Sequence, residues 1–139
     1  MLIKVSLSII SIVLAFNYSY SRYNEIKQTV MLYEEVFRFA KAAKQNLLSH
    51  CAPITTLLPA QLTNGTPPLI FSHEYQDCIR EYLQAYETLP SDKLISQSEA
   101  FIKITEEELL KASKKAEKDI HINLCVPPLC ALLFSLAII

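Results

Sequence analysis

The chain has 139 residues, the size of a single domain. Apolar residues make up 51% of it and charged residues 19%, and a mean hydropathy of +0.23 excludes a disordered protein. The net charge of -1 lacks the basic excess of a nucleic-acid-binding protein, and the single glycine excludes Gly-rich phosphate loops. These numbers predict an all-α protein that is not an enzyme, has no cofactor and takes no small-molecule substrate.

The two ends of the chain are apolar. Residues 5–16 and 124–139 carry no charge, whereas the residues between them hold all fourteen acidic side chains and twelve of the thirteen basic ones. A helix that crosses a membrane needs about 20 apolar residues. We therefore predict an N-terminal transmembrane helix at 1–20, a helical domain at 21–121 and a C-terminal transmembrane helix at 122–139.

A long helix follows the first apolar segment. No glycine or proline occurs between residues 2 and 49, and apolar residues recur there at a spacing of three and four. The predicted seam is Ile26, Val30, Tyr33, Phe37, Ala40 and Leu47, widened by Leu32, Val36, Phe39 and Ala43. This spacing predicts one amphipathic helix that continues directly from the apolar segment.

Prolines and turn residues divide the middle of the chain. Pro53 predicts the first turn of a short helix that includes Ile54, Leu57 and Leu58, and residues 62–68 (LTNGTPP) predict a loop. Ser72 is predicted to cap a helix that ends near Leu89-Pro90. One face of this helix carries Tyr75, Ile79, Tyr82, Leu83 and Tyr86, and its tyrosines indicate a half-exposed face.

The last predicted helix is capped by Ser91 or Asp92. Its seam is Leu94, Ser98, Phe101, Thr105, Leu109, Ala112 and Ala116. Pro127 and Pro128 remove two amide donors from its C-terminal part, and we expect a kinked helix that continues rather than one that starts again at Pro127.

Two long polar stretches have similar lengths. Residues 22–49 and 92–122 measure about 42 and 46 Å at about 1.5 Å per residue. Both leave the same face of the membrane and meet the middle segment. We therefore predict an antiparallel hairpin of long helices standing on the membrane, with residues 50–91 as a small helical cap at its far end.

Basic residues flank the apolar segments mostly on one side. Lys4 lies beyond them, whereas the polar side carries Arg22, Lys27, Lys111, Lys114, Lys115 and Lys118. The positive-inside rule therefore predicts a cell-membrane protein whose helical domain lies in the cytoplasm.

A second interpretation stays open, in which the protein is a secreted or lipid-anchored helical domain of unknown function. Residues 1–21 then form a cleaved signal peptide with Ser19 and Ser21 before the cut, and the apolar tail is an anchor signal that follows Ala112-Ser113. Asn64-Gly-Thr would then be a glycosylation sequon.

The residues that carry site chemistry are few. His50, Cys51, His73 and Cys78 form the only set that resembles metal ligands, and their spacing matches no closed zinc pattern. Cys51 and Cys78 flank the middle segment and are the candidate pair for a disulfide, although free thiols are expected in the cytosol. Cys125 and Cys130 are expected to act as small apolar residues, and the acids at 34–35 and 106–108 as solvated side chains. We predict no catalytic, cofactor-binding or metal-binding residue.

Several short motifs lie along the chain: Ser21-Arg22-Tyr23, Ala52-Pro53-Ile54, Leu89 with Ser91-Asp92, Gln97, and the Glu/Lys-rich stretch from Leu109 to Lys118. Together they resemble the motifs of the stage III sporulation protein AB family of endospore-forming Firmicutes. The apolar segments at both ends occur in the same order, so the resemblance covers nearly the whole chain.

The resemblance implies a non-enzymatic component of the secretion-like channel between mother cell and forespore. It implies a helical domain in the mother-cell cytoplasm, similar to those of type II secretion and type IV pilus platform proteins. The domain would relay between a cytoplasmic ATPase and the membrane parts of the complex. On this basis we expect the partner surface around Tyr75, Tyr82 and Tyr86, together with the charged faces of the long helices.

Overall fold

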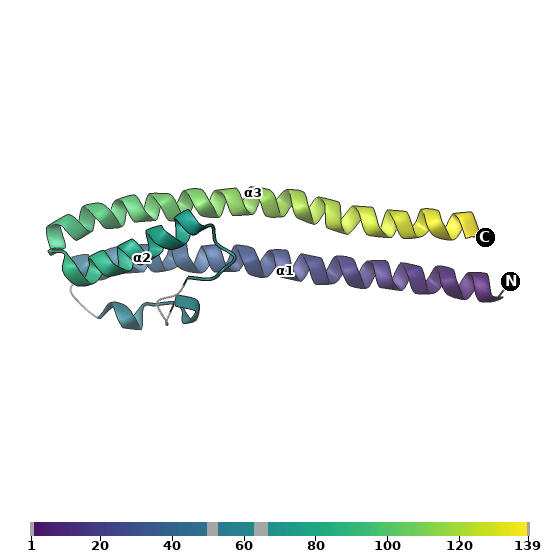
Figure 1. Cartoon of the computed structure of the whole chain (residues 1–139), viewed down its shortest axis with the longest axis horizontal. Helices are drawn as coiled ribbons and strands as arrows, with labels where there is room; N and C mark the ends of the chain where they lie inside the picture. The colour runs from purple at the N-terminus through teal and green to yellow at the C-terminus, as the bar shows by residue number, and fades with distance from the viewer. Residues whose placement is uncertain (1, 50–52, 63–66, 139) are drawn as a thin grey trace. The chain divides into compact units, whose positions relative to one another are not determined.

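The computed structural model describes residues 2–49, 53–62 and 67–138, and all regular secondary structure in these ranges is helical. The elements, in chain order, are α1 (Leu2–Ser49), the 3₁₀ turns η1 (Ile54–Thr56) and η2 (Ala60–Leu62), α2 (His73–Thr88) and α3 (Ser91–Ile138) (Figure 1). The predicted all-α fold is confirmed, and so is the expectation that each apolar end belongs to a long helix.

The limits of α2 follow from local chemistry. The Ser72 hydroxyl accepts a hydrogen bond from the Tyr75 amide at 3.3 Å, as its predicted role as cap requires. The helix ends where the Leu89 amide donates to the Ala85 carbonyl, at 2.9 Å. Leu89 is extended because it precedes a proline, which disfavours helical backbone at that position.

Helix α3 begins one residue earlier than predicted. Ser91 is already helical, and the Pro90 carbonyl accepts from the Leu94 amide at 3.1 Å. The prediction that Ser91 or Asp92 precedes the helix as its cap is therefore wrong. Pro90 takes the cap position instead. The extended residue Leu89 ends α2, and α3 begins directly after Pro90.

The segment between α1 and α2 differs from the prediction. Pro53 is extended, with φ of -65° and ψ of 145°, and precedes η1 instead of lying in its first turn. The predicted short helix is only a 3₁₀ turn, because Pro59 disfavours helical backbone at the residue before it. The predicted loop begins later than residue 62, since Leu62 belongs to η2, and residues 63–66 of that loop lie outside the described residues.

Two compact units divide the chain. We call residues 31–111 the central unit and residues 1–30 with 112–139 the terminal unit. Within the central unit, α2 runs alongside the helical segments of α1 and α3 (Figure 1). The middle segment is therefore not a cap at the end of a hairpin. Its apolar face needs a matching apolar surface, and the sides of the two long helices provide one.

The core of the central unit draws on every element. Its buried members are Val36, Phe39, Ala40 and Ala43 of α1, Leu62, Phe71, Tyr75, Ile79 and Tyr82 of the middle segment, and Phe101 of α3. The widening positions of α1 therefore face the core. Phe37 of the predicted seam is only half-buried, with the Lys41 ammonium 4.1 Å from its ring centre. The α3 seam is confirmed from Leu94 to Thr105, because its members there are buried.

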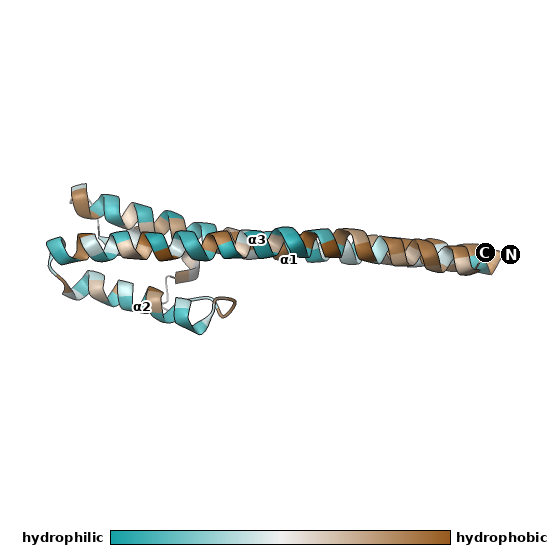
Figure 2. Cartoon of the chain, turned by 90° about the horizontal axis from the view of Figure 1, so that it is seen from above, coloured by the Kyte–Doolittle hydropathy of each residue, from teal (hydrophilic) through white to brown (hydrophobic). Residues whose placement is uncertain are grey.

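The terminal unit pairs the start of α1 with the end of α3. Both chain ends lie at the same end of this unit, so the two helical segments are antiparallel (Figure 1). Their hydrophobic residues are concentrated toward the chain ends, and hydrophilic residues increase in the opposite direction (Figure 2). Helix α3 continues through Pro127 and Pro128, which confirms a continuing helix over one that restarts.

Candidate functional site

Among the described residues of the terminal unit, the buried ones are small. They are Ser8, Ser19, Ala116, Ala131 and Ser135, each at most 8% exposed. Ala131 and Ser135 are one helical turn apart and so occupy the same side of α3. Small side chains let two helix backbones approach closely, which is how helices pack inside lipid.

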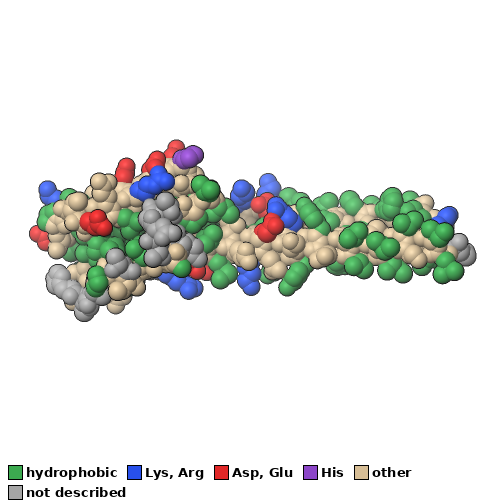
Figure 3. Space-filling model, turned by 60° about the horizontal axis from the view of Figure 1, so that its bottom comes forward, with side chains coloured by type: hydrophobic (Ala, Val, Ile, Leu, Met, Phe, Trp, Pro, Cys, Tyr) green, Lys and Arg blue, Asp and Glu red, His purple; other side chains and the backbone are tan. Residues whose placement is uncertain are grey.

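Most of the large apolar side chains of the same unit point outward. They include Leu2, Ile3, Leu14 and Phe16 of α1 and Leu133, Phe134 and Leu136 of α3, each more than half exposed. Hydrophobic side chains cover this part of the unit on the face drawn in Figure 3. Helices α1 and α3 each contain a window long and apolar enough to cross a membrane, and only 11% of that window is buried.

Two hydroxyl groups in this packing have no hydrogen-bond partner. Ser8 Oγ and Ser19 Oγ are both buried and unpaired. By contrast, Ser11 Oγ donates to the Ser8 carbonyl at 3.0 Å and Ser135 Oγ to the Leu132 carbonyl at 2.8 Å. The hydroxyls of Ser8 and Ser19 therefore remain available for hydrogen bonds to helix carbonyls, the usual polar contact between membrane helices.

A groove of about 430 Å³ opens between the two helical segments of the terminal unit. Its walls are mainly apolar and include Tyr23, Ile26, Val30, Ala116 and Ile120. This volume lies within the range of small-molecule sites.

Three ionisable side chains also line this groove. Lys27 comes from α1, and Glu117 and His121 come from α3. All three are exposed, and no ion pair or side-chain hydrogen bond joins any of them to another described residue. Opposite charges therefore line one groove without neutralising each other. This set was not predicted from the sequence, although Glu117 and His121 stand one helical turn apart, which places them on one face.

An aromatic cluster forms in the central unit. The Tyr33 ring lies 4.6 Å from that of Phe71 and 5.7 Å from that of Tyr75, centre to centre. The Tyr75 hydroxyl is buried without a hydrogen-bond partner. Burial raises the pKa of Tyr75 far above its ordinary value, and the negative charge of Glu108 raises this pKa further. The phenol is therefore held neutral.

Glu108 differs from its neighbours in the acidic run. Glu106 and Glu107 are exposed, as predicted, but the Glu108 side chain is only 23% exposed and accepts a hydrogen bond from Lys111 Nζ at 2.7 Å. The pKa of Cys78 is raised by burial first, and then by the charges of Glu81 and Glu108. Glu108 is therefore less exposed than its two neighbours, because its side of α3 faces the packed aromatic residues.

The predicted tyrosine surface is largely core. Tyr75 and Tyr82 are 2% and 4% exposed, and Tyr86 is half-buried. The Tyr82 ring stacks on that of Phe101 at 4.1 Å, and its hydroxyl lies 2.8 Å from Ser98 Oγ. The prediction of a partner surface around Tyr75 and Tyr82 is therefore wrong. Their rings form the apolar face of α2, and the packing of α2 against the long helices covers them.

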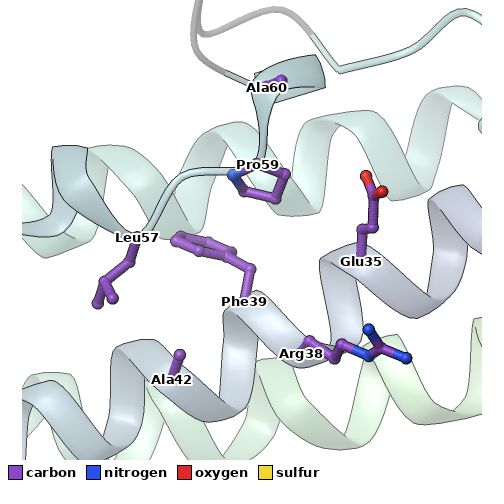
Figure 4. Close-up of a pocket in the computed structure, with 7 residues that line it drawn as sticks. All are labelled: Glu35, Arg38, Phe39, Ala42, Leu57, Pro59 and Ala60. Atoms are coloured by element: carbon purple, nitrogen blue, oxygen red, sulfur yellow. The ribbon is translucent and has the colours of Figure 1, made fainter.

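A second groove, of about 340 Å³, lies where the segment after Pro53 crosses α1. The side chains of Phe39, Leu57 and Pro59 lie around it, with Glu35 and Arg38 at its edge (Figure 4). Arg38 is exposed and pairs with Glu34 at 3.8 Å. An apolar hollow beside charged groups is the usual arrangement of a pocket that receives one anchoring side chain from a protein partner.

The ligand-like residues do not gather in the described part of the chain. His73 is exposed and Cys78 is half-buried and free, whereas His50 and Cys51 lie outside the described residues. No three His, Cys, Asp or Glu side chains come together there as a metal site would require. Cys125 and Cys130 are free thiols exposed on the terminal unit.

No family model, curated protein or solved structure matches this chain. Membership in the stage III sporulation protein AB family therefore stays a prediction.

Proposed function

We propose that this protein is a membrane-anchored scaffold. The terminal unit inserts in the bilayer as a pair of helices, and the central unit assembles with partner proteins at the membrane surface. The scaffold is not an enzyme. In its specific form, taken from the sequence resemblance, the complex is a secretion-like sporulation channel, and the partner is a cytoplasmic ATPase in the mother cell.

One observation carries the membrane part of this proposal. In the terminal unit Ser8, Ser19 and Ala131 are buried, while side chains as large as Phe16 and Phe134 are exposed. Water would favour the opposite arrangement, because burying a Leu or Phe side chain stabilises a soluble fold by about 1.5–3 kcal/mol. In lipid the large side chains lose nothing by pointing outward, and small residues allow close packing.

Alkaline extraction of membranes tests the anchor. Full-length protein is expected to stay in the membrane pellet at high pH and to dissolve only with detergent. Release into the wash would contradict a pair of spanning helices. The intact mass of the purified protein separates the two interpretations of the N-terminus, because cleavage after Ser21 would support a signal peptide.

The orientation is tested by thiol labelling. Glu106 is exposed on α3, so Glu106→Cys in a variant with the native cysteines replaced by alanine offers one reactive thiol. We expect an impermeant maleimide to label it only after the cells are opened. Labelling in intact cells would place the central unit outside.

The groove beside Phe39 is the best-supported partner surface of the central unit. A photo-reactive amino acid in place of Arg38 samples its edge, and the same replacement at the exposed Lys103 is the matched control. In native membranes we expect a cross-link to an ATPase at the first position only. Equal cross-linking at both positions, or none at Arg38, would contradict this surface.

A further inference from the structure

The groove of the terminal unit has the character of a lipid headgroup site. It lies where the charged segments of α1 and α3 give way to uncharged ones, since α3 carries no Asp, Glu, Lys or Arg after Asp119. Its walls are apolar, and the Tyr23 ring at its edge combines an apolar body with a polar hydroxyl. Basic pockets between membrane helices at the bilayer surface bind the phosphate-bearing headgroups of anionic lipids, and Lys27 and His121 are the basic residues of this groove.

We propose that this groove binds the headgroup of a phosphatidylethanolamine lipid. The inference rests on the proposed function, because it requires the terminal unit to lie in a bilayer. Lys27 and His121 bind the phosphate, and Glu117 accepts hydrogen bonds from the ammonium group. The acyl chains lie along the uncharged part of the two helices.

The charges that line the groove match a zwitterion. Lys27 is positive and Glu117 is negative, both are exposed, and neither is paired with another described residue, so both can contact a ligand group of opposite charge. A purely anionic headgroup would leave Glu117 facing a like charge. A phosphoethanolamine group satisfies both side chains, because its phosphate and its ammonium are separated by two carbon atoms.

The order of the groups along α3 also matches. His121 stands one turn, about 6 Å, nearer to the uncharged end of the helix than Glu117 does. In phosphatidylethanolamine the phosphate adjoins the glycerol and acyl chains, and the ammonium lies farther out. The phosphate-binding imidazole and the ammonium-binding carboxylate therefore follow the same order as the lipid groups they contact.

Hydrogen bonding explains why this lipid is favoured over related ones. The primary ammonium has three N–H donors for the Glu117 carboxylate, whereas the quaternary ammonium of phosphatidylcholine has none. Phosphatidylglycerol has no cation. Losing one hydrogen bond to a charged group lowers the affinity about tenfold or more.

Native mass spectrometry of the full-length protein measures this preference. The protein is delipidated in detergent and titrated separately with dioleoyl phosphatidylethanolamine, phosphatidylcholine and phosphatidylglycerol. We expect phosphatidylethanolamine to bind about tenfold more tightly than either of the others. Equal binding of the three lipids, or preference for phosphatidylglycerol, would overturn the proposal.

Variants assign the roles of the individual side chains. Glu117→Gln is expected to remove the preference for phosphatidylethanolamine without weakening phosphatidylglycerol, whereas Lys27→Gln weakens all three lipids. Glu106→Gln and Lys103→Gln are controls at exposed positions of the central unit and leave binding unchanged. Far-UV circular dichroism shows that each variant is folded. Equal effects of the groove and control variants would also overturn the site.

The outcome separates this inference from the proposed anchor. A protein that stays in alkali-washed membranes but binds the three lipids equally overturns the lipid site alone. A protein that leaves the membrane on alkaline washing overturns the anchor and the lipid site with it.

Discussion

The hydrogen bond between Tyr82 and Ser98 provides a sharp test of the central core. The two hydroxyl oxygens lie 2.8 Å apart, and the residues are 4% and 0% exposed. Ser98→Ala leaves a buried phenol without a partner, which costs about 1–3 kcal/mol of unfolding free energy. Tyr82→Phe costs less, about 0.5–1.5 kcal/mol, because the serine hydroxyl can turn to a carbonyl of its own helix.

The double variant distinguishes a real interaction from two independent losses. With both hydroxyls removed no polar group remains unpaired, so Tyr82→Phe with Ser98→Ala is expected to be less destabilised than the sum of the single variants by about 1–3 kcal/mol. Ser96→Ala, on the exposed side of the same helix, is the control and changes stability by less than about 0.5 kcal/mol.

Urea unfolding of the full-length protein in detergent micelles provides the measurement. The described aromatic ring contacts all belong to the central unit, so the near-UV circular dichroism of tyrosine follows this unit. Strict additivity of the two single losses would refute the reasoning, because it would mean that the two hydroxyls do not interact.

Three further predictions concern pH, helix packing and an ion pair. Because burial raises the pKa of Tyr75 above its ordinary 10.0, the folded chain keeps a proton that the unfolded chain releases; stability is therefore expected to fall above pH 10. This group contributes up to about 1.4 kcal/mol per pH unit to the fall, so Tyr75→Phe should make the fall shallower in urea titrations, and an unchanged slope would contradict the assignment. In the terminal unit, Ala131→Phe overpacks a buried position and is expected to cost about 1–3 kcal/mol, seen as a lower melting temperature in micelles. Leu133→Phe lies on the exposed side and should leave that temperature unchanged; equal effects would contradict the proposed packing. The ion pair of Lys44 with Glu99 measures 2.8 Å but is partly exposed, so Lys44→Ala should cost at most about 1 kcal/mol, and a loss that persists in about 1 M salt would argue against an electrostatic origin.

The helices and their limits were largely predictable because their signals are local. The absence of Gly and Pro between residues 2 and 49, together with the helical spacing of apolar residues, predicts one uninterrupted helix, and Ser72 supplies a cap hydrogen bond within its own turn. The charge-free ends of the chain were predictable for the same reason, because they are visible in the residue types alone. The predictions failed at Pro53 and Pro90, where the backbone of neighbouring residues sets the start of the turn or helix.

The sites were less predictable because they depend on pairs of elements. The periodicity of α2 placed Tyr75 and Tyr82 on one face, but whether that face meets water or another helix depends on the partner. The groove beside Lys27 and Glu117 likewise exists only because segments far apart in the sequence pack together.

Backbone propensity and residue type act over a few neighbouring residues, so the helical class, the continuity of the two long helices and the separation of charged from uncharged segments could be predicted from local signals. Packing between elements sets which stripe of each helix is buried, places the middle segment alongside the long helices, and puts small residues at the contact within the terminal unit. In α1 both the predicted seam and the positions beside it are apolar, and the surface that packs against the helix determines which of the two is buried.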